Sequence, residues 1–546
     1  MMEGGLNTPA TADDDSQLAP GTIVFGEVSD STQPKPTPSD NPNDPLNWSS
    51  KRKIVNYAII SFYALMVFSV LSVGPILWVN FMIDLGMTTQ ELNNQFAANS
   101  AGLSVGCVIF IPFALKYGRR PVYITSTLIT FGMSIWQAKM KTYGEMVASQ
   151  LIMGLSTAVS ETLVQMTVTD MFFVHERATM NGIYLLMVSI GSFLAPVAAG
   201  YIDAAQGWRW VFWWCVIFIG INSILFIFFY EETKFAYHQT IVGSPTPTTS
   251  ADKTETSKSK SDSSLPEEAM DNSTNGDSGG HINYAIPMNS YRQRLAFSTP
   301  TAGSSKTFFR HIYQPFIVLF SFPIVAYVAL QYGSTLTWFS ILMTMQPTYF
   351  GVAPYNFNST QIGLLSLPPF IGSILGSIYG GPLNDWSIMF FARRNKGIYE
   401  PEMRLYLTLL PSLLAPIGLF VYGYGVENGA PWIVPCIGSA FFGFSMIAAG
   451  DNALTYLSDS YAEILGDALV AVAFVRNILA TIVVFVLTPW ITNLGLHNFV
   501  TSMGCLSLGI NLLVVPMIIY GKRSRIACAG SYAKMQSLQF DPRGIM

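Results

Sequence analysis

The chain has 546 residues, of which 50% are hydrophobic and only 11% are charged, against about 25% charged residues in soluble proteins. Its net charge of −4 offers no basic surface for nucleic acid. The five cysteines lie far apart in the sequence, so we expect neither a disulfide framework nor a metal site. No HExxH motif, Walker-type loop or nucleophile elbow is present. The composition therefore indicates a membrane protein, without catalytic residues and without a cofactor.

Twelve mostly apolar runs are long enough to cross a bilayer, which takes about 20 residues because lipid offers the backbone no hydrogen-bond partner. The predicted spans are residues 55–79, 94–115, 121–139, 145–169, 182–203, 210–230, 315–339, 360–383, 404–425, 431–457, 467–491 and 498–520. They fall into an N-terminal half (54–230) and a C-terminal half (314–520). The sequence thus predicts an all-α membrane protein with twelve transmembrane helices in two six-helix halves.

Three polar segments complete the predicted organisation. Residues 1–53 indicate a disordered N-terminal tail, residues 231–313 a flexible central linker and residues 521–546 a C-terminal tail. Of the 29 lysine and arginine residues, few lie in the loops on the side opposite the tails: Lys139, Lys141 and Arg209. The positive-inside rule therefore predicts that both termini and the linker are cytoplasmic. We expect a multi-pass protein of the plasma membrane.

The two halves share a sequence pattern. Gly154 in the fourth span is followed sixteen residues later by Asp170, and Gly443 in the tenth span is followed sixteen residues later by Asp459. Matched pairs at equivalent positions of two six-helix halves indicate a parallel repeat. Such repeats place a binding site between the halves, near the middle of the bilayer.

The loop after the second span, residues 116–121, reads Lys-Tyr-Gly-Arg-Arg-Pro. It resembles the end of the loop signature of the major facilitator superfamily, and residues 381–385 resemble the complementary motif of the second half. The Gly and Asp that open the signature are replaced by Ile111 and Leu115, and the arginine of the fourth span is replaced by Gln150. A charge relay built from that Asp and Arg is therefore not implied.

Residues 191–200 are similar to the antiporter motif of twelve-helix drug:proton exchangers. A closer resemblance, to a fungal group that includes the yeast histidinol and polyamine permease, is carried by residues 43–49, 149–151, 161–175 and 231–233. It implies a monomeric transporter in the lipid bilayer whose partners are a small-molecule substrate and protons. That group also contains many exporters of drugs and fungal metabolites.

Three ionisable residues lie deep in predicted spans: Glu161, Asp451 and Arg476. Each is about 12–14 Å from the cytoplasmic helix end, and ionisable residues inside a membrane are functional candidates. The two acids are expected to clamp a cationic solute between the halves and, because desolvation favours the protonated carboxyl group, to carry protons. Gln165, one helical turn after Glu161, and Asn452, beside Asp451, are further binding candidates. The alternative is a buried ion pair of Arg476 with Asp451, together with interhelical hydrogen bonds.

Several residues are candidates for gating. They are Gly118, Arg119, Arg120, Asp170, Asp385, Pro196 and Gly200. The charged members could form salt bridges at the cytoplasmic helix ends or remain solvated, and Pro196 and Gly200 indicate a bend or close packing in the fifth span. Asn358-Ser-Thr360 is a glycosylation sequon in an outer loop.

The leading hypothesis is a proton-coupled secondary transporter that exports small organic compounds, cationic or amphipathic, such as drugs or fungal metabolites. The alternative is a proton-driven uptake permease for polyamine-like cations. A transporter-shaped nutrient sensor and a carrier of anions or neutral solutes remain open as further readings. Without a P-loop, an ion gradient is the expected driving force.

Overall fold

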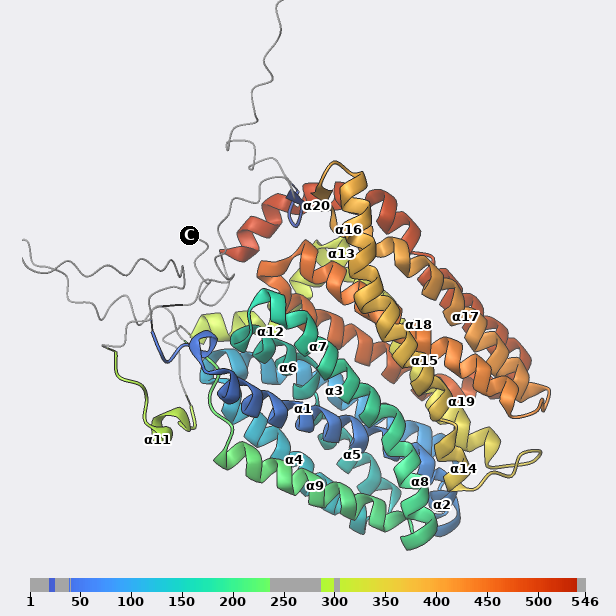
Figure 1. Ribbon diagram of the computed structural model, residues 1–546. Helices are drawn as coiled ribbons and strands as arrows, with labels where there is room; N and C mark the ends of the chain where they lie inside the picture. Colours follow the sequence, from blue (N-terminus) through green and yellow to red (C-terminus); the bar gives the residue numbers. More distant parts are fainter. Residues whose placement is uncertain (1–18, 25–38, 40, 236–285, 299–304, 538–546) are drawn as a thin grey trace, which may run out of the picture.

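The computed structural model describes residues 19–24, 39, 41–235, 286–298 and 305–537. The described part consists of long helices arranged as two halves, one from each part of the sequence (Figure 1). We call the end at which α1 begins and α20 ends the proximal end, and the opposite end the distal end.

The N-terminal half contains six membrane-crossing stretches, several of them interrupted. Its elements are α1 (Ser50–Val73), η3 (Pro75–Leu77), α2 (Trp78–Leu85), α3 (Thr89–Tyr117), α4 (Arg119–Lys139), α5 (Tyr143–Thr157), α6 (Val159–Met171), α7 (Val174–Ser189), η4 (Ile190–Leu194), α8 (Ala195–Gln206) and α9 (Trp208–Phe228). A short turn, η2 (Pro45–Asn47), precedes α1, and one helical turn, α11 (Tyr291–Arg294), lies between the halves in sequence.

The C-terminal half repeats this plan. Its elements are α12 (Ser305–Ser321), α13 (Pro323–Met345), η5 (Gln346–Phe350), α14 (Ser359–Leu364), α15 (Leu367–Ile378), η6 (Tyr379–Leu383), α16 (Asn384–Arg394), η7 (Pro401–Arg404), α17 (Leu405–Glu427), α18 (Ile433–Ser460), η8 (Ala462–Ile464), α19 (Leu465–Asn511) and α20 (Val514–Gln536). The strands β1 (Ile23–Val24) and β2 (Ile398–Tyr399) form a small antiparallel sheet.

All twelve predicted spans fall on helices. Within the described residues, nine helices are long and apolar enough to cross a membrane, and the bent pair α12–α13 makes a tenth. One of the nine, Ala462–Gln536, has 75 residues, which corresponds to more than about 100 Å of helix and therefore to two crossings of a 30 Å core. Its backbone turns at Gly495 (φ 75°, ψ 158°). The third predicted span is α4, which packs against α5 and α9.

The seventh span begins later than residue 315, where the sequence pattern placed it. α12 ends at Ser321, the chain bends by 97°, and Pro323 opens α13. The apolar run continues through the bend because α12 carries an exposed apolar row, namely Phe309, Tyr313, Ile317 and Phe320. A helix that meets the following span at a steep angle and exposes such a row is typical of a membrane-interface helix.

The glycines of the predicted repeat occupy equivalent places in the two halves. A Cβ on Gly154 would lie 2.0 Å from the carbonyl oxygen of Asn99 on α3, and a Cβ on Gly443 would lie 2.3 Å from that of Pro369 on α15. In each half, therefore, the fourth crossing packs backbone to backbone against the second. Only glycine permits this approach.

Candidate substrate site

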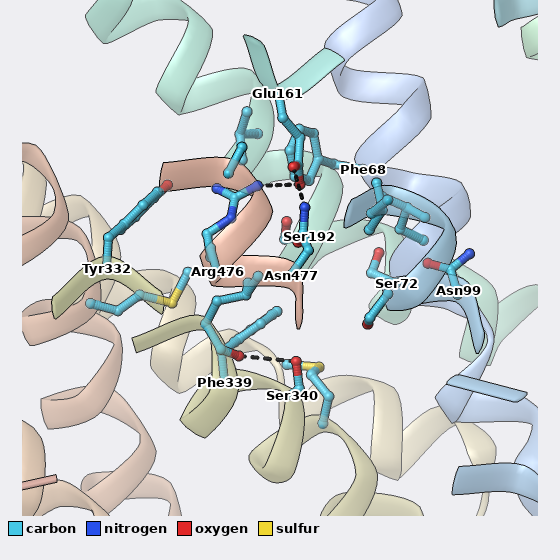
Figure 2. Close-up of a pocket in the computed structure, with 18 of the residues that line it drawn as sticks. Phe68, Ser72, Asn99, Glu161, Ser192, Tyr332, Phe339, Ser340, Arg476 and Asn477 are labelled. Carbon is cyan, nitrogen blue, oxygen red and sulfur yellow. Dashed lines mark hydrogen bonds and ion pairs between the residues drawn. The ribbon is translucent and has the colours of Figure 1, made fainter. Parts of the chain in front are cut away.

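A central cavity lies between the two halves, with a volume of about 1150 Å3 including the part open to solvent. The N-terminal half contributes residues of α1, α3, α6 and α7 to its wall, and the C-terminal half contributes residues of α13, α18 and α19. The wall is mostly apolar and aromatic, with a few polar groups such as Ser72, Asn99, Ser192 and Ser340 (Figure 2). Organic ligands commonly bind in such pockets, where apolar walls supply contact area and a few polar groups supply orientation.

Glu161 and Arg476 form an ion pair in this cavity, joining α6 of one half to α19 of the other. The pair is between Glu161 Oε1 and Arg476 Nη2, and the side chains are 4% and 9% exposed. Asn477 adds a second link, since its Nδ2 donates to Glu161 Oε2 over 2.8 Å. Figure 2 shows both α19 side chains pointing toward this carboxylate. The acid thus holds the two halves together at the centre of the molecule.

The remaining surroundings of Arg476 are largely apolar. Its guanidinium lies 5.0 Å from the ring centroid of Tyr332, a cation–π distance, and the buried Nε has no hydrogen-bond partner among the described residues. Cys107 Sγ approaches Glu161 Oε2 at 3.8 Å. Since a buried charge without its counterion is strongly destabilising, the arginine depends on Glu161.

A break in the fourth crossing positions Glu161. α5 ends at Thr157 and α6 begins at Val159, and Glu161 N donates to the carbonyl oxygen of Ala158, three residues earlier. The side chains of Glu161 and Gln165 line the cavity. Thr157, one helical turn before Glu161, donates its hydroxyl to Met153 O over 2.8 Å and does not line the cavity. Broken helices at membrane depth are typical of transporter binding sites.

The second predicted acid does not line this cavity. Asp451 is on α18 where this helix packs against η6, with its Cβ 3.2 Å from the position that a Cβ on Gly380 would take. Within the described residues its carboxylate makes no hydrogen bond or ion pair, and Arg476 therefore pairs with Glu161 and not with Asp451. Asn452 accepts a hydrogen bond of 2.6 Å from Asn384 Nδ2. The structure thus separates Asp451 and Asn452 from Glu161 and Gln165.

The loop residues predicted for gating form a buried network at the proximal end of the N-terminal half. Arg119 Nε pairs with Asp170 Oδ2 at 3.1 Å, and Arg120 donates to Tyr230 O over 2.9 Å. Gly118, with φ 113°, supplies the left-handed backbone between α3 and α4 that other residues rarely adopt.

Glu232 completes that network, and the sequence analysis did not single it out as a site residue. It follows α9 and accepts the backbone N–H groups of Arg119 (2.9 Å) and Arg120 (3.1 Å) at the start of α4. A carboxylate at a helix N-terminus is favourably placed. Burial nevertheless raises the pKa of Glu232, against the opposing effect of these hydrogen bonds.

The C-terminal half carries the matching network around Arg404, which the sequence analysis missed. Arg404 pairs with Asp459 at 2.5 Å and with Asp385 at 3.0 Å, and Tyr399 OH also donates to Asp459 over 2.5 Å. Arg404 opens the third crossing of its half, as Arg119 does in the first half, and each pairs with the aspartate that ends the fourth. The repeat of Asp170 and Asp459 could have led to this arginine.

Pro196 and Gly200 lie at the distal end, where α8 of one half packs against α14 of the other (Figure 1). Gly200 O accepts a hydrogen bond of 3.1 Å from Thr360 Oγ1, and a Cβ on Gly363 would lie 2.7 Å from Pro196 O. Asn358, the residue of the sequon, caps α14 by accepting from Gln361 N over 2.9 Å. The two halves are therefore in contact at this end.

Comparison with known proteins agrees with this architecture. The model of the Major Facilitator Superfamily matches residues 57–484. The chain belongs to the Major Facilitator Superfamily. An uncharacterized MFS-type transporter of Schizosaccharomyces pombe is 35% identical, covering 91% of this chain and 89% of that protein. Protein HOL1 of Saccharomyces cerevisiae is 28% identical, with 90% of each chain covered, and the MFS transporter cpaT of Aspergillus oryzae is 29% identical, with 89% and 91% covered.

Solved structures of the superfamily share the fold. The proton:xylose symporter XylE bound to 6-bromo-6-deoxy-D-glucose has a TM-score of 0.55 at 15% identity, covering 86% of this chain and 97% of that chain. The human organic anion transporter MFSD10 has a TM-score of 0.53 at 15% identity, with 86% and 100% covered. The superfamily comprises membrane transporters and not enzymes, so this multi-pass protein is a transporter of small molecules.

Proposed function

We propose that this member of the superfamily is a proton-coupled exporter of small organic compounds, cationic or amphipathic, with Glu161 as the shared site of proton and substrate. The observation that carries the proposal is the ion pair between Glu161 and Arg476 across the two halves, inside a cavity with aromatic walls. Plasma-membrane location with both termini in the cytosol is part of the proposal. The distal end would then face the outside.

The chemistry follows from competition for one carboxylate. A proton on Glu161 removes the negative charge that holds Arg476, and a substrate amine can replace the guanidinium as the cation bound to it. Either event weakens the ionic link between α6 and α19, while the hydrogen bond from Asn477 can persist. Because the two binding events exclude each other, a proton gradient can drive the substrate out as the halves rock about the site.

The cavity wall suggests which compounds fit. Its aromatic members are Phe68, Phe96, Tyr184, Tyr332 and Phe339. Aromatic faces attract organic cations and pack against planar apolar groups. A cation with an apolar body would satisfy both the carboxylate and the wall.

A specific observation favours the second candidate function, proton-driven uptake of polyamine-like cations. Asp451, on α18 of the other half, is a half-buried acid whose carboxylate forms no ion pair or hydrogen bond with the described residues. A linear polyamine carries several amines and could use this acid in addition to Glu161. Protonation of Asp451 would serve equally well in an exporter, so transport direction must be measured.

Accumulation assays distinguish the two directions. Fungal cells lacking their own organic-cation exporters and polyamine uptake would express the intact protein, Glu161→Gln or Asp451→Asn, with surface expression measured for each. Export predicts lowered accumulation of labelled tetraphenylphosphonium at matched membrane potential, restored by removing the pH gradient and by Glu161→Gln. The control Glu427→Gln, at a partly exposed acid near the distal end, should export normally. Raised spermidine accumulation that requires both acids would establish uptake instead, and no effect on either cation would refute both functions.

A further inference from the structure

The N-terminal tail is docked onto the proximal end of the C-terminal half. β1 (Ile23–Val24) pairs antiparallel with β2 (Ile398–Tyr399), with Ile23 opposite Tyr399 and Val24 opposite Ile398. In Figure 1 this dark blue strand lies beside α20, away from the blue helices of its own half. We call residues 19–24 the docking strand.

A buried arginine recognises the docking strand. Arg525 of α20 is fully buried, and its Nη1 donates to Pro20 O (2.5 Å) and to Thr22 Oγ1 (3.1 Å). Its Nε and Nη2 bind Glu402 at 2.9 and 2.6 Å. The docking strand therefore supplies the acceptors for Nη1, which Glu402 does not bind. Removing the strand would leave this guanidinium nitrogen without those partners.

The close contact between the docking strand and α18 favours glycine at position 21. Its φ is +83°, and a Cβ there would lie 2.3 Å from the carbonyl oxygen of Asp459, so both conformation and space favour glycine. Asp459 is also the residue whose carboxylate binds Tyr399 and Arg404. The docking strand thus touches the network at the proximal end of α18 twice, through Gly21 and through the pairing with Tyr399.

The stretch that follows lies on the other half. Leu46, in the turn η2 before α1, is buried, and η2 packs against α6. Fifteen residue steps join Val24 to Ser39, which lies beside this turn through its hydrogen bond to Asp44, and so many steps span at most about 50 Å. The tail is therefore attached to both halves at the proximal end.

We propose that the docking strand is an intramolecular clip that stabilises the state with closed distal contacts and detaches as the distal end opens. The binding free energy of the strand contributes only to states that keep Asp459, Tyr399 and Arg525 in the arrangement it fits. A state in which α18 moves relative to β2 and α20 within the C-terminal half loses that contribution, because the strand contacts all three elements. Displacing the strand would then shift the population toward the distal-open state, whatever the substrate.

Cross-linking tests the docking itself. In full-length protein with Cys505 and Cys528 replaced by serine, Val24→Cys combined with Ile398→Cys should form a disulfide, because directly paired strand residues have suitable Cα separations. Val24→Cys combined with Arg394→Cys, an exposed position outside β2, is the matched control. Equal cross-linking of the two pairs, or none, would overturn the proposal.

Distance measurements test the conformational role. Spin labels on Lys141→Cys and Asn428→Cys, exposed distal positions of the two halves, would report opening in lipid nanodiscs without any substrate. Gly21→Ala should increase the long-distance population several-fold, whereas Gly530→Ala, where a Cβ meets open space, should not. If the disulfide between positions 24 and 398 forms in protein that keeps Gly21, but Gly21→Ala leaves the spin-label distances unchanged, the clip is refuted. These readouts do not depend on the proposed substrate or direction.

Discussion

The ion pair between Glu161 and Arg476 makes a strong prediction for stability. Glu161→Gln leaves the guanidinium of Arg476, 9% exposed, with the ring of Tyr332 at 5.0 Å as its main compensation. Removing one partner of a buried ion pair destabilises proteins by about 3–5 kcal/mol, whereas replacing both partners by neutral groups is often nearly neutral. We therefore expect Glu161→Gln to lower the melting temperature markedly and Glu161→Gln/Arg476→Met to recover most of the loss.

A double-mutant cycle compares native protein, Glu161→Gln, Arg476→Met and the double variant. Their thermal unfolding is measured in nanodiscs by tryptophan fluorescence. The coupling between the two substitutions should be about 3 kcal/mol, well above the few tenths expected for independent sites. Combining Arg476→Met with Glu427→Gln, an acid that faces His497 at the distal end, provides the matched control and should be additive. Additivity of Glu161→Gln with Arg476→Met would refute the claim that the pair is energetically coupled.

Three further outcomes are expected. Gly154→Ala should destabilise the protein by about 1–3 kcal/mol through overpacking, because its Cβ would lie 2.0 Å from a carbonyl oxygen of α3. The control Gly132→Ala, whose Cβ would meet open space, should leave stability unchanged. Equal melting temperatures of the two variants would contradict the close packing at Gly154. Arg404→Met should cost on the order of 1–3 kcal/mol by freeing Asp459, a loss that Arg404→Lys should partly reverse, and full stability of the methionine variant would refute the role of this network. The pKa of Glu232 is raised in the folded protein, so the folded state binds the proton of this carboxyl more tightly than the unfolded state, and the stability it contributes falls as pH rises through the raised pKa. The melting temperature of native protein should therefore exceed that of Glu232→Gln by less and less from about pH 5 upward. A difference that grows with pH would show that the hydrogen bonds to Glu232 outweigh its burial.

Much of the architecture follows from local sequence properties. Span length is set by the bilayer, so apolar runs locate the crossings, and close helix packing requires glycine, so the spacing of Gly154 and Gly443 reveals the repeat. The partner of Arg476 could not be obtained in this way. Glu161 and Asp451 lie at similar depth, and the rotation of each helix about its axis decides which acid faces the cavity. The break at Ala158 and the packing of α18 set those rotations, and both depend on tertiary contacts.

The docking strand escaped sequence analysis for a different reason. Its two paired residues, Ile23 and Val24, are too few to form a detectable strand pattern in a polar tail. The seventh span was placed too early because the exposed apolar face of α12 continues the apolar run that begins at Pro323. In both cases contacts with another part of the protein or with the membrane interface, and not the local sequence pattern, determined the structure.

The pairing found in the cavity changes how its selectivity should be understood. A clamp of two acids would attract cations through net charge, but Glu161 is neutralised by Arg476 from the other half. A cation must therefore displace the arginine, and its affinity depends on binding the carboxylate better than a guanidinium that is preorganised at the site. An anion would have to displace Glu161 instead, leaving that carboxylate buried beside the apolar wall. A released arginine would retain the ring of Tyr332, and a released glutamate would retain the hydrogen bond from Asn477 and the contact with Cys107. Each freed charge therefore keeps a partial partner, and it is the aromatic wall, which attracts organic cations, that favours cationic substrates without requiring a negatively charged cavity.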